Sequence, residues 1–279
     1  MLLASIVAFA LLCLAPSGAL AAEGPSYVSL GDSYTSGPGI APPAGVADCA
    51  QSAVNYPHLT AAALNLSLTD VSCAGATVWN MIEAQYADQP PQFDALSPST
   101  EIVTLSIGGN DNNFYSSSVS ICTFIDAEIL ANGGSPCKKH FGHSLTDEII
   151  SDGALIGEAI HLIHVHSPSA KVFVVGYPNL LPKQGNCPAS LPWTPGDYHF
   201  WDGLERKYNS VFKSRAKANG ATYVDTYKGS VGHDICQPLG VRWMEPLYGG
   251  EGAGLHPNAL GEQHQALAVE QAMSKAGIH

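Results

Sequence analysis

The chain has 279 residues, of which 46% are hydrophobic and 13% charged, and its formal net charge is −12. This acidity argues against nucleic acid as a partner and against electrostatic attraction to anionic membrane surfaces. The apolar fraction can build a sizeable core, and the length suits one large α/β domain or two small ones. Because no internal repeat or domain boundary is evident, we expect a single domain over residues 23–279. We separately expect the protein to act as a monomer.

Residues 1–22 have the pattern of a secretory signal peptide. An almost unbroken apolar run over residues 2–14 is followed by the small-x-small sequence at residues 19–21. The run is short for a membrane-spanning helix, and Pro-Ser-Gly at residues 16–18 interrupts it. No other stretch is long and apolar enough to span a bilayer, so we expect a secreted, extracellular protein with no transmembrane segment.

Cysteine usage agrees with export. Six cysteines remain after residue 22, namely Cys49, Cys73, Cys122, Cys137, Cys187 and Cys236. An even number in an exported chain suggests three disulfides, although six cysteines allow many pairings. Pairing in chain order is the simplest of these. The absence of a C-x-x-C pair argues against a zinc ribbon or a thioredoxin-like motif.

Short apolar runs alternate with helical periodicity along the chain. The predicted strands are residues 27–30, 66–71, 101–107, 170–176 and 221–226. The predicted helices are residues 56–64, 77–86, 143–166, 200–220 and 258–275. Residues 36–49 and 177–198 are expected to be loops, the first a candidate cleft wall, and residues 112–142 an insertion stapled by one disulfide. The alternation predicts a three-layer α/β/α fold with a mostly parallel central sheet.

Polar residues follow three of these strands. Gly31-Asp32-Ser33 comes directly after the first strand, and such a turn lifts a serine hydroxyl out of the sheet edge, so Ser33 is the candidate nucleophile. Gly75 and Asn110 follow the second and third strands. The carboxyl ends of parallel strands meet at one edge, where ligands gather. Taken singly, each of these motifs is also compatible with an ordinary turn or helix cap.

Several histidines compete for a role as base or ligand. His256 stands in a His-Pro-Asn sequence just before the last predicted helix, with Pro257 expected in its first turn, whereas His264 lies on that helix and His233 in a loop. His161, His164 and His166 fall near the end of another predicted helix without an evident acidic or cysteine ligand nearby. Histidines there also suit the helix dipole, so we expect no metal and no cofactor.

Taken together, Gly31-Asp32-Ser33, Gly75, the Gly-Gly-Asn-Asp at residues 108–111 and the His-Pro-Asn at residues 256–258 resemble the SGNH hydrolase superfamily, also called GDSL esterases and lipases. The motifs fall in the family order across nearly the whole chain. The six cysteines resemble those of secreted three-disulfide actinobacterial esterases and lipases, which favours the pairs Cys49–Cys73, Cys122–Cys137 and Cys187–Cys236. The resemblance implies the flavodoxin-like fold of that family.

The resemblance also implies roles. Ser33 attacks the carbonyl of a small-molecule or lipid ester to form an acyl-enzyme, and His256 acts as general base. The backbone N–H groups of Ser33 and Gly75 and the side-chain amide of Asn110 form the oxyanion hole. Asp32 and Asp111, which adjoin Ser33 and Asn110, are expected to brace turns.

One position departs from the family pattern. The family usually has an aspartate three residues before the histidine, and here that residue is Ala253. We expect a main-chain carbonyl near residue 253 to orient His256, which leaves a Ser–His dyad; Glu251 is the competing candidate.

Other functions stay open at this point. A phospholipase or a carbohydrate deacetylase can use the same scaffold, and a catalytically inactive binding protein is a further alternative. Apolar residues near the expected site line either an acyl pocket or the core; they are Trp193, Trp201, Trp243, Tyr248 and Leu255.

Overall fold

The computed structural model describes residues 24–129 and 133–279, so the predicted signal peptide at residues 1–22 lies outside the described residues. A five-stranded, all-parallel sheet with the order β4-β1-β5-β6-β7 forms the centre. Its strands are β4 (Ser67–Asp70), β1 (Ser26–Gly31), β5 (Ile102–Ser106), β6 (Lys171–Val175) and β7 (Thr222–Val224). Numbered along the chain, this order is 2-1-3-4-5, that of flavodoxin-like doubly wound folds. A separate antiparallel pair joins β2 (Pro43–Ala44) to β3 (Gln51–Ser52).

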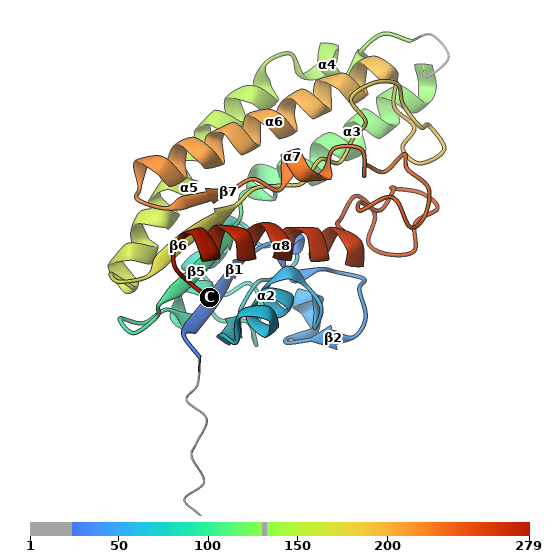
Figure 1. Ribbon diagram of the computed structural model, residues 1–279. Helices are drawn as coiled ribbons and strands as arrows, with labels where there is room; N and C mark the ends of the chain where they lie inside the picture. Colours follow the sequence, from blue (N-terminus) through green and yellow to red (C-terminus); the bar gives the residue numbers. More distant parts are fainter. Residues whose placement is uncertain (1–23, 130–132) are drawn as a thin grey trace, which may run out of the picture.

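Helices cover both faces of the sheet, as Figure 1 shows. On one face lie α2 (Tyr56–Leu64) and α8 (Ala259–Lys275), and on the other α5 (Ser144–His166) and α6 (Pro195–Ala218). Successive side chains of a strand point to opposite faces, so Ile102 packs in the α2/α8 layer while Val103 packs in the α5/α6 layer. The predicted three-layer α/β/α fold is confirmed.

Capping residues explain where several helices begin. Asn55 accepts a hydrogen bond from the backbone N–H of His58, so α2 begins at Tyr56 as predicted. Thr194 caps α6, whose first residue is Pro195, a favoured first position, so this helix begins five residues before the predicted start. Asn258 caps α8, and Pro257 therefore precedes the helix rather than forming part of its first turn.

Two segments differ from the prediction. Residues 112–142 carry α3 (Phe114–Ile129) and α4 (Pro136–Phe141), so much of the expected insertion is helical. Residues 77–86 form only the 3-10 helix η2 (Val78–Met81) instead of an α-helix. The remaining short helices are α1 (Ser33–Ser36), α7 (Tyr227–Ser230), η1 (Ala47–Cys49), η3 (Gln92–Ala95) and η4 (Asp111–Asn113).

Three disulfides join the cysteines in chain order. They are Cys49–Cys73, Cys122–Cys137 and Cys187–Cys236. The first ties the loop that contains η1 to the strand end that precedes Gly75, and the second joins α3 to α4. Over the part of the chain that the structure describes, no helix has the length and apolar character needed to cross a membrane.

Candidate active site

The candidate site lies where the order of the strands reverses. Ser33 follows β1 and Asn110 follows β5, and these two strands are neighbours in the sheet, whereas β4, the next sheet strand after β1 in the chain, lies on the other side of β1. Such a switch point leaves a crevice outside the carboxyl ends of the strands, which is where doubly wound folds bind ligands. The topology therefore brings together two residues 77 positions apart in the chain.

Ser33 is the first residue of the short helix α1. Asp32 caps this helix, with Oδ1 accepting a hydrogen bond from the Tyr34 N–H at 2.9 Å. A side chain at Gly31 would lie 2.7 Å from the Ser106 carbonyl oxygen of β5, so only glycine lets the two strands end this close together. Among the described residues, the Ser33 N–H donates no hydrogen bond, as is usual for the first N–H groups of a helix.

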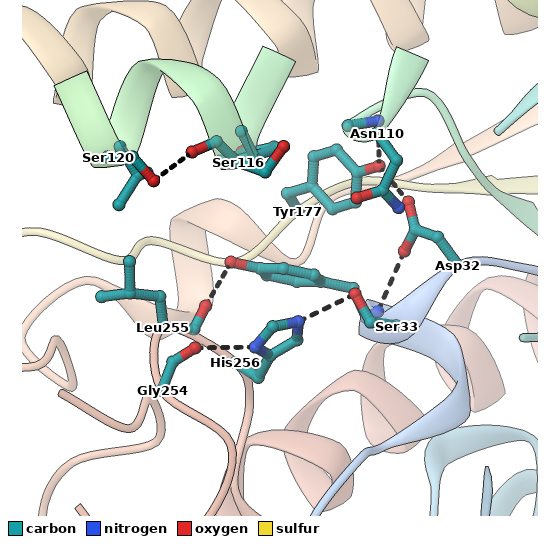
Figure 2. Close-up of a pocket in the computed structure, with 13 residues that line it drawn as sticks. Asp32, Ser33, Asn110, Ser116, Ser120, Tyr177, Gly254, Leu255 and His256 are labelled. Carbon is teal, nitrogen blue, oxygen red and sulfur yellow. Dashed lines mark hydrogen bonds between the residues drawn. The ribbon is translucent and has the colours of Figure 1, made fainter. Parts of the chain in front are cut away.

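His256 contacts both Ser33 and a main-chain carbonyl (Figure 2). Its Nε2 lies 2.8 Å from Ser33 Oγ, and its Nδ1 lies 2.8 Å from the carbonyl oxygen of Gly254. A carbonyl can only accept, so Nδ1 carries the proton and Nε2 is left free to accept from the Ser33 hydroxyl. Burial lowers the pKa of His256, although the Gly254 bond opposes the shift. Burial therefore favours the neutral imidazole, with Nε2 facing the Ser33 hydroxyl.

The carbonyl beside Nδ1 belongs to Gly254, next to residue 253, where a main-chain carbonyl was expected nearby. Glu251 is exposed, and its backbone N–H donates to the Glu245 carboxylate at 3.0 Å. Glu245 also pairs with Arg242 at 3.1 Å, and its backbone N–H donates to the His256 carbonyl at 2.8 Å. The loop that carries His256 is thus fixed by main-chain and ionic contacts.

Asn110 lies on the other side of Ser33 in the same cavity. One N–H of its side-chain amide donates to the Ala76 carbonyl at 2.9 Å, which leaves the second N–H free to bind an oxyanion. The next residue, Asp111, accepts hydrogen bonds from the Val78 N–H at 3.2 Å. These contacts hold the strand end after β5 against the turn that contains Gly75.

Gly75 lies within that turn with a φ of +80°, in the left-handed region that favours glycine. It is exposed and does not line the cavity that contains Ser33. Its N–H donates no hydrogen bond to any described residue. Its part in the oxyanion hole stays a prediction.

Two buried carboxyl groups brace the turns around the site. Asp32 is 1% exposed, and its Oδ2 accepts a hydrogen bond from the Tyr177 hydroxyl at 2.6 Å; the same hydroxyl accepts from the Gly109 N–H at 3.0 Å. Tyr177 thereby connects the turn after β1 to the loop of Asn110. Burial raises the pKa of Asp32 to about 7 and that of Asp111 to about 7.

A cavity of about 260 Å³ opens beside Ser33. Its walls come from the segments after β1, β5 and β6, the His256 loop and α3. The lining residues are Asp32, Ser33, Tyr34, Gly109, Asn110, Tyr115, Ser116, Val119, Ser120, Tyr177, Gly254, Leu255 and His256. The expected loop wall at residues 36–49 is not among them. The α3 wall was missed by sequence reasoning, although the four-residue spacing of Tyr115 and Val119 is a helical signal.

Of the proposed acyl-pocket residues, only Leu255 lines the cavity. Trp193 and Trp201 are buried in the core, and Tyr248 is 54% exposed. Trp243 stacks between His233 and His264, the two histidines that competed with His256. Neither of these histidines contacts Ser33.

The histidines near the end of α5, His161, His164 and His166, gather no further ligands. Over residues 24–129 and 133–279, no group of three or more histidine, cysteine or acidic side chains is arranged to hold a metal ion.

Comparison with known proteins gives consistent matches. The sequence profile of the GDSL-like Lipase/Acylhydrolase family matches residues 29–264. Lipase 2 of Streptomyces coelicolor is 39% identical over 259 residues, which span 90% of this chain and 86% of that protein. The crystal structure of phospholipase A1 from Streptomyces albidoflavus is 29% identical, with a TM-score of 0.75, and covers 89% of this chain and 99% of that one. An extracellular lipase from Streptomyces rimosus is 25% identical, with a TM-score of 0.74, and covers 89% and 100%.

Proposed function

Because the chain belongs to the GDSL-like Lipase/Acylhydrolase family and is therefore an ester hydrolase, we propose that it cleaves carboxylic esters through an acyl-enzyme on Ser33. The observation that carries this proposal is the contact of 2.8 Å between Ser33 Oγ and His256 Nε2. Nucleophile and base within hydrogen-bond reach, with the base oriented by a third group, are what covalent acyl transfer requires.

The reaction has two halves. Ser33 Oγ bonds to the ester carbonyl carbon while its proton passes to His256 Nε2, and the tetrahedral intermediate then expels the alcohol, which takes that proton. Water next attacks the acyl-serine and gives a proton to His256. Ser33 regains a proton from His256 as the carboxylic acid leaves.

The negative charge that develops on the carbonyl oxygen needs donors fixed in advance. We assign this role to the Ser33 N–H, the free N–H of the Asn110 amide and the Gly75 N–H. The unpaired state of the two backbone N–H groups among the described residues supports the assignment, as does the position of Asn110 in the cavity.

The base is proposed to work without a carboxylate. In the position where an acid would orient the imidazole, the Gly254 carbonyl accepts from Nδ1. This bond sets the tautomer and stabilises the imidazolium that forms during each half-reaction, as the acid of a triad does. The result is a Ser33–His256 dyad.

The mainly apolar wall of the cavity suits an acyl chain, so a lipid or another acyl ester is the proposed substrate. Phospholipid hydrolysis is a second candidate, favoured by the likeness to the phospholipase A1 of Streptomyces albidoflavus. We further propose that the protein is secreted, because disulfides persist in oxidising compartments and the similar protein of Streptomyces rimosus is described as extracellular.

The test is hydrolysis of p-nitrophenyl esters, from acetyl to palmitoyl, in the presence of EDTA. We expect the wild type to be active, Ser33→Ala and His256→Ala to lose activity by several orders of magnitude, and the chain-length optimum to separate lipase from deacetylase. Phosphatidylcholine vesicles, assayed for released fatty acid, test the second candidate. Full activity of Ser33→Ala would refute the acyl-enzyme.

A further inference from the structure

The backbone at Leu255, next to His256, has an unusual conformation. Leu255 has a φ of +62°, in the left-handed region that bulky side chains rarely adopt. Such a conformation persists only where surrounding contacts hold it, and it is often found at functional sites. The question is therefore what holds Leu255 in this state.

Two distant groups hold the peptide planes on either side of Leu255. Its N–H, in the same plane as the Gly254 carbonyl, donates to the Glu245 carbonyl oxygen at 2.8 Å. Its own carbonyl accepts a hydrogen bond from the Tyr34 hydroxyl at 2.6 Å. The second plane also contains the His256 N–H, which donates to the Ala253 carbonyl at 3.2 Å. Together these bonds fix the rotation between the two planes and keep the Gly254 carbonyl facing His256 Nδ1.

Tyr34 is itself well fixed. It follows Ser33 directly, its N–H donates to Asp32, and the residue is 7% exposed. The ring lies against Tyr177 with centroids 4.9 Å apart and against the His256 imidazole with centroids 5.3 Å apart. Tyr34, the residue after Ser33, therefore holds Leu255, the residue before His256.

We propose that the Tyr34 hydroxyl is a positioning group that keeps the His256 imidazole in the tautomer with the proton on Nδ1. In a catalytic triad, a side-chain carboxylate has this function. This inference rests on the proposed function of Ser33 and His256. Without the hydroxyl, the peptide plane between Leu255 and His256 is less restrained. The His256 imidazole then shifts relative to the Gly254 carbonyl, which the Glu245 bond still holds, and the Nδ1 contact weakens. The proton on the imidazole is then free to occupy Nε2, where it blocks proton transfer from Ser33.

The test compares Tyr34→Phe with Tyr198→Phe. The first substitution removes only the hydroxyl and keeps the ring that lines the cavity. The second removes a buried tyrosine hydroxyl that donates to a main-chain carbonyl of Leu191 at 2.9 Å, outside the candidate site. For Tyr34→Phe we expect kcat to fall roughly 10- to 100-fold with KM little changed, because loss of orientation acts on the chemical step. Tyr198→Phe should keep the wild-type kcat.

The nitrogen-15 spectrum of the imidazoles at alkaline pH supplies a readout that does not depend on activity. The His256 signals are assigned by comparison with His256→Asn. The wild type should show a protonated Nδ1 and a bare Nε2, and Tyr34→Phe a mixture of both tautomers.

An unchanged His256 spectrum in Tyr34→Phe would overturn the inference, and so would a kcat equal to that of Tyr198→Phe. Failure of the proposed function has a different signature, namely activity that survives in Ser33→Ala or His256→Ala.

Discussion

The Gly254 carbonyl oxygen accepts a hydrogen bond from His256 Nδ1 at 2.8 Å, while Glu251, the acid considered for this role from the sequence, is exposed and contacts Glu245 through its backbone. A carbonyl two residues before the histidine is available in any chain, but it reaches Nδ1 only when the intervening backbone turns sharply, as it does at Leu255. The contact of a carbonyl with His256 Nδ1 therefore depends on the conformation of this loop.

The first prediction concerns Glu251. Because its side chain is exposed and the Nδ1 position is already occupied by a carbonyl, we expect Glu251→Ala to keep kcat/KM within about twofold of the wild type. His256→Ala, measured in the same assay, should abolish turnover. Equal losses in the two variants would rule out the dyad.

The second prediction concerns Asn110. Replacing it with alanine removes one proposed oxyanion donor and should lower kcat by about 100- to 1000-fold while the protein stays folded. Asn219→Ala is the matched control, because the Asn219 amide also donates to a main-chain carbonyl, that of Arg215, at 2.9 Å. Circular dichroism checks the fold of both variants, and an active Asn110→Ala would remove Asn110 from the oxyanion hole.

The third prediction concerns the acid limb of the pH profile. Burial lowers the pKa of His256 below its usual 6.5, and only the neutral imidazole can accept the Ser33 proton. We expect kcat/KM to remain above half of its plateau at pH 6.5 and to fall at lower pH. An NMR titration of His256 separates its contribution from that of Asp32, whose pKa is raised to about 7. A His256 pKa above 6.5 would contradict the account.

The fourth prediction concerns stability and pH. Burial raises the pKa of Asp32 from 3.8 to about 7, so the folded state holds this proton more tightly than the unfolded state. The resulting stabilisation is complete below the unfolded pKa and is lost as the pH rises through the folded pKa. Urea unfolding at a series of pH values should therefore show the wild type losing stability relative to Asp32→Asn between about pH 4 and 7, by a few kcal/mol at most. If the free energy of unfolding changed with pH in the same way in both proteins, the raised pKa of Asp32 would be refuted.

The fifth prediction concerns the α3 wall. Val119 lines the cavity beside Ser33, and a tryptophan there would fill space that a long acyl chain needs. We expect Val119→Trp to lower kcat/KM for p-nitrophenyl palmitate at least about tenfold, while the acetyl ester, which serves as the internal control, changes little. A uniform loss on all chain lengths would place the acyl chain elsewhere.

Much of the fold follows from local patterns. The apolar strands and the capped helix at residues 56–64 were predictable because their periodicity and caps agree with the final packing. The α3 helix was missed because its many serines obscured the apolar spacing. The helix predicted at residues 200–220 begins earlier, at Pro195. This proline was assigned to a proline-rich loop, although proline suits the first position of a helix.

Of the candidate site, the residues that stand in sequence motifs were predictable, and the contacts between distant loops were not. Ser33, Asn110 and His256 were chosen because each stands at the end of a predicted strand or the start of a helix, and these three line one cavity. The contacts of Tyr34 with Leu255 and of Tyr177 with Asp32 join residues more than 140 positions apart. No local sequence pattern predicts such pairs, because they depend on how the loops meet at the carboxyl ends of the strands.

The most direct test of the central claim is to label the nucleophile covalently with a reagent that stays bound to the enzyme. The wild type, Ser33→Ala and His256→Ala are exposed to an alkyl fluorophosphonate, digested, and mapped by peptide mass. We predict that the wild type carries one phosphonyl group on Ser33, that Ser33→Ala carries none, and that His256→Ala is modified far more slowly. A wild type that hydrolyses esters yet is labelled at another residue, or not at all, would contradict the mechanism.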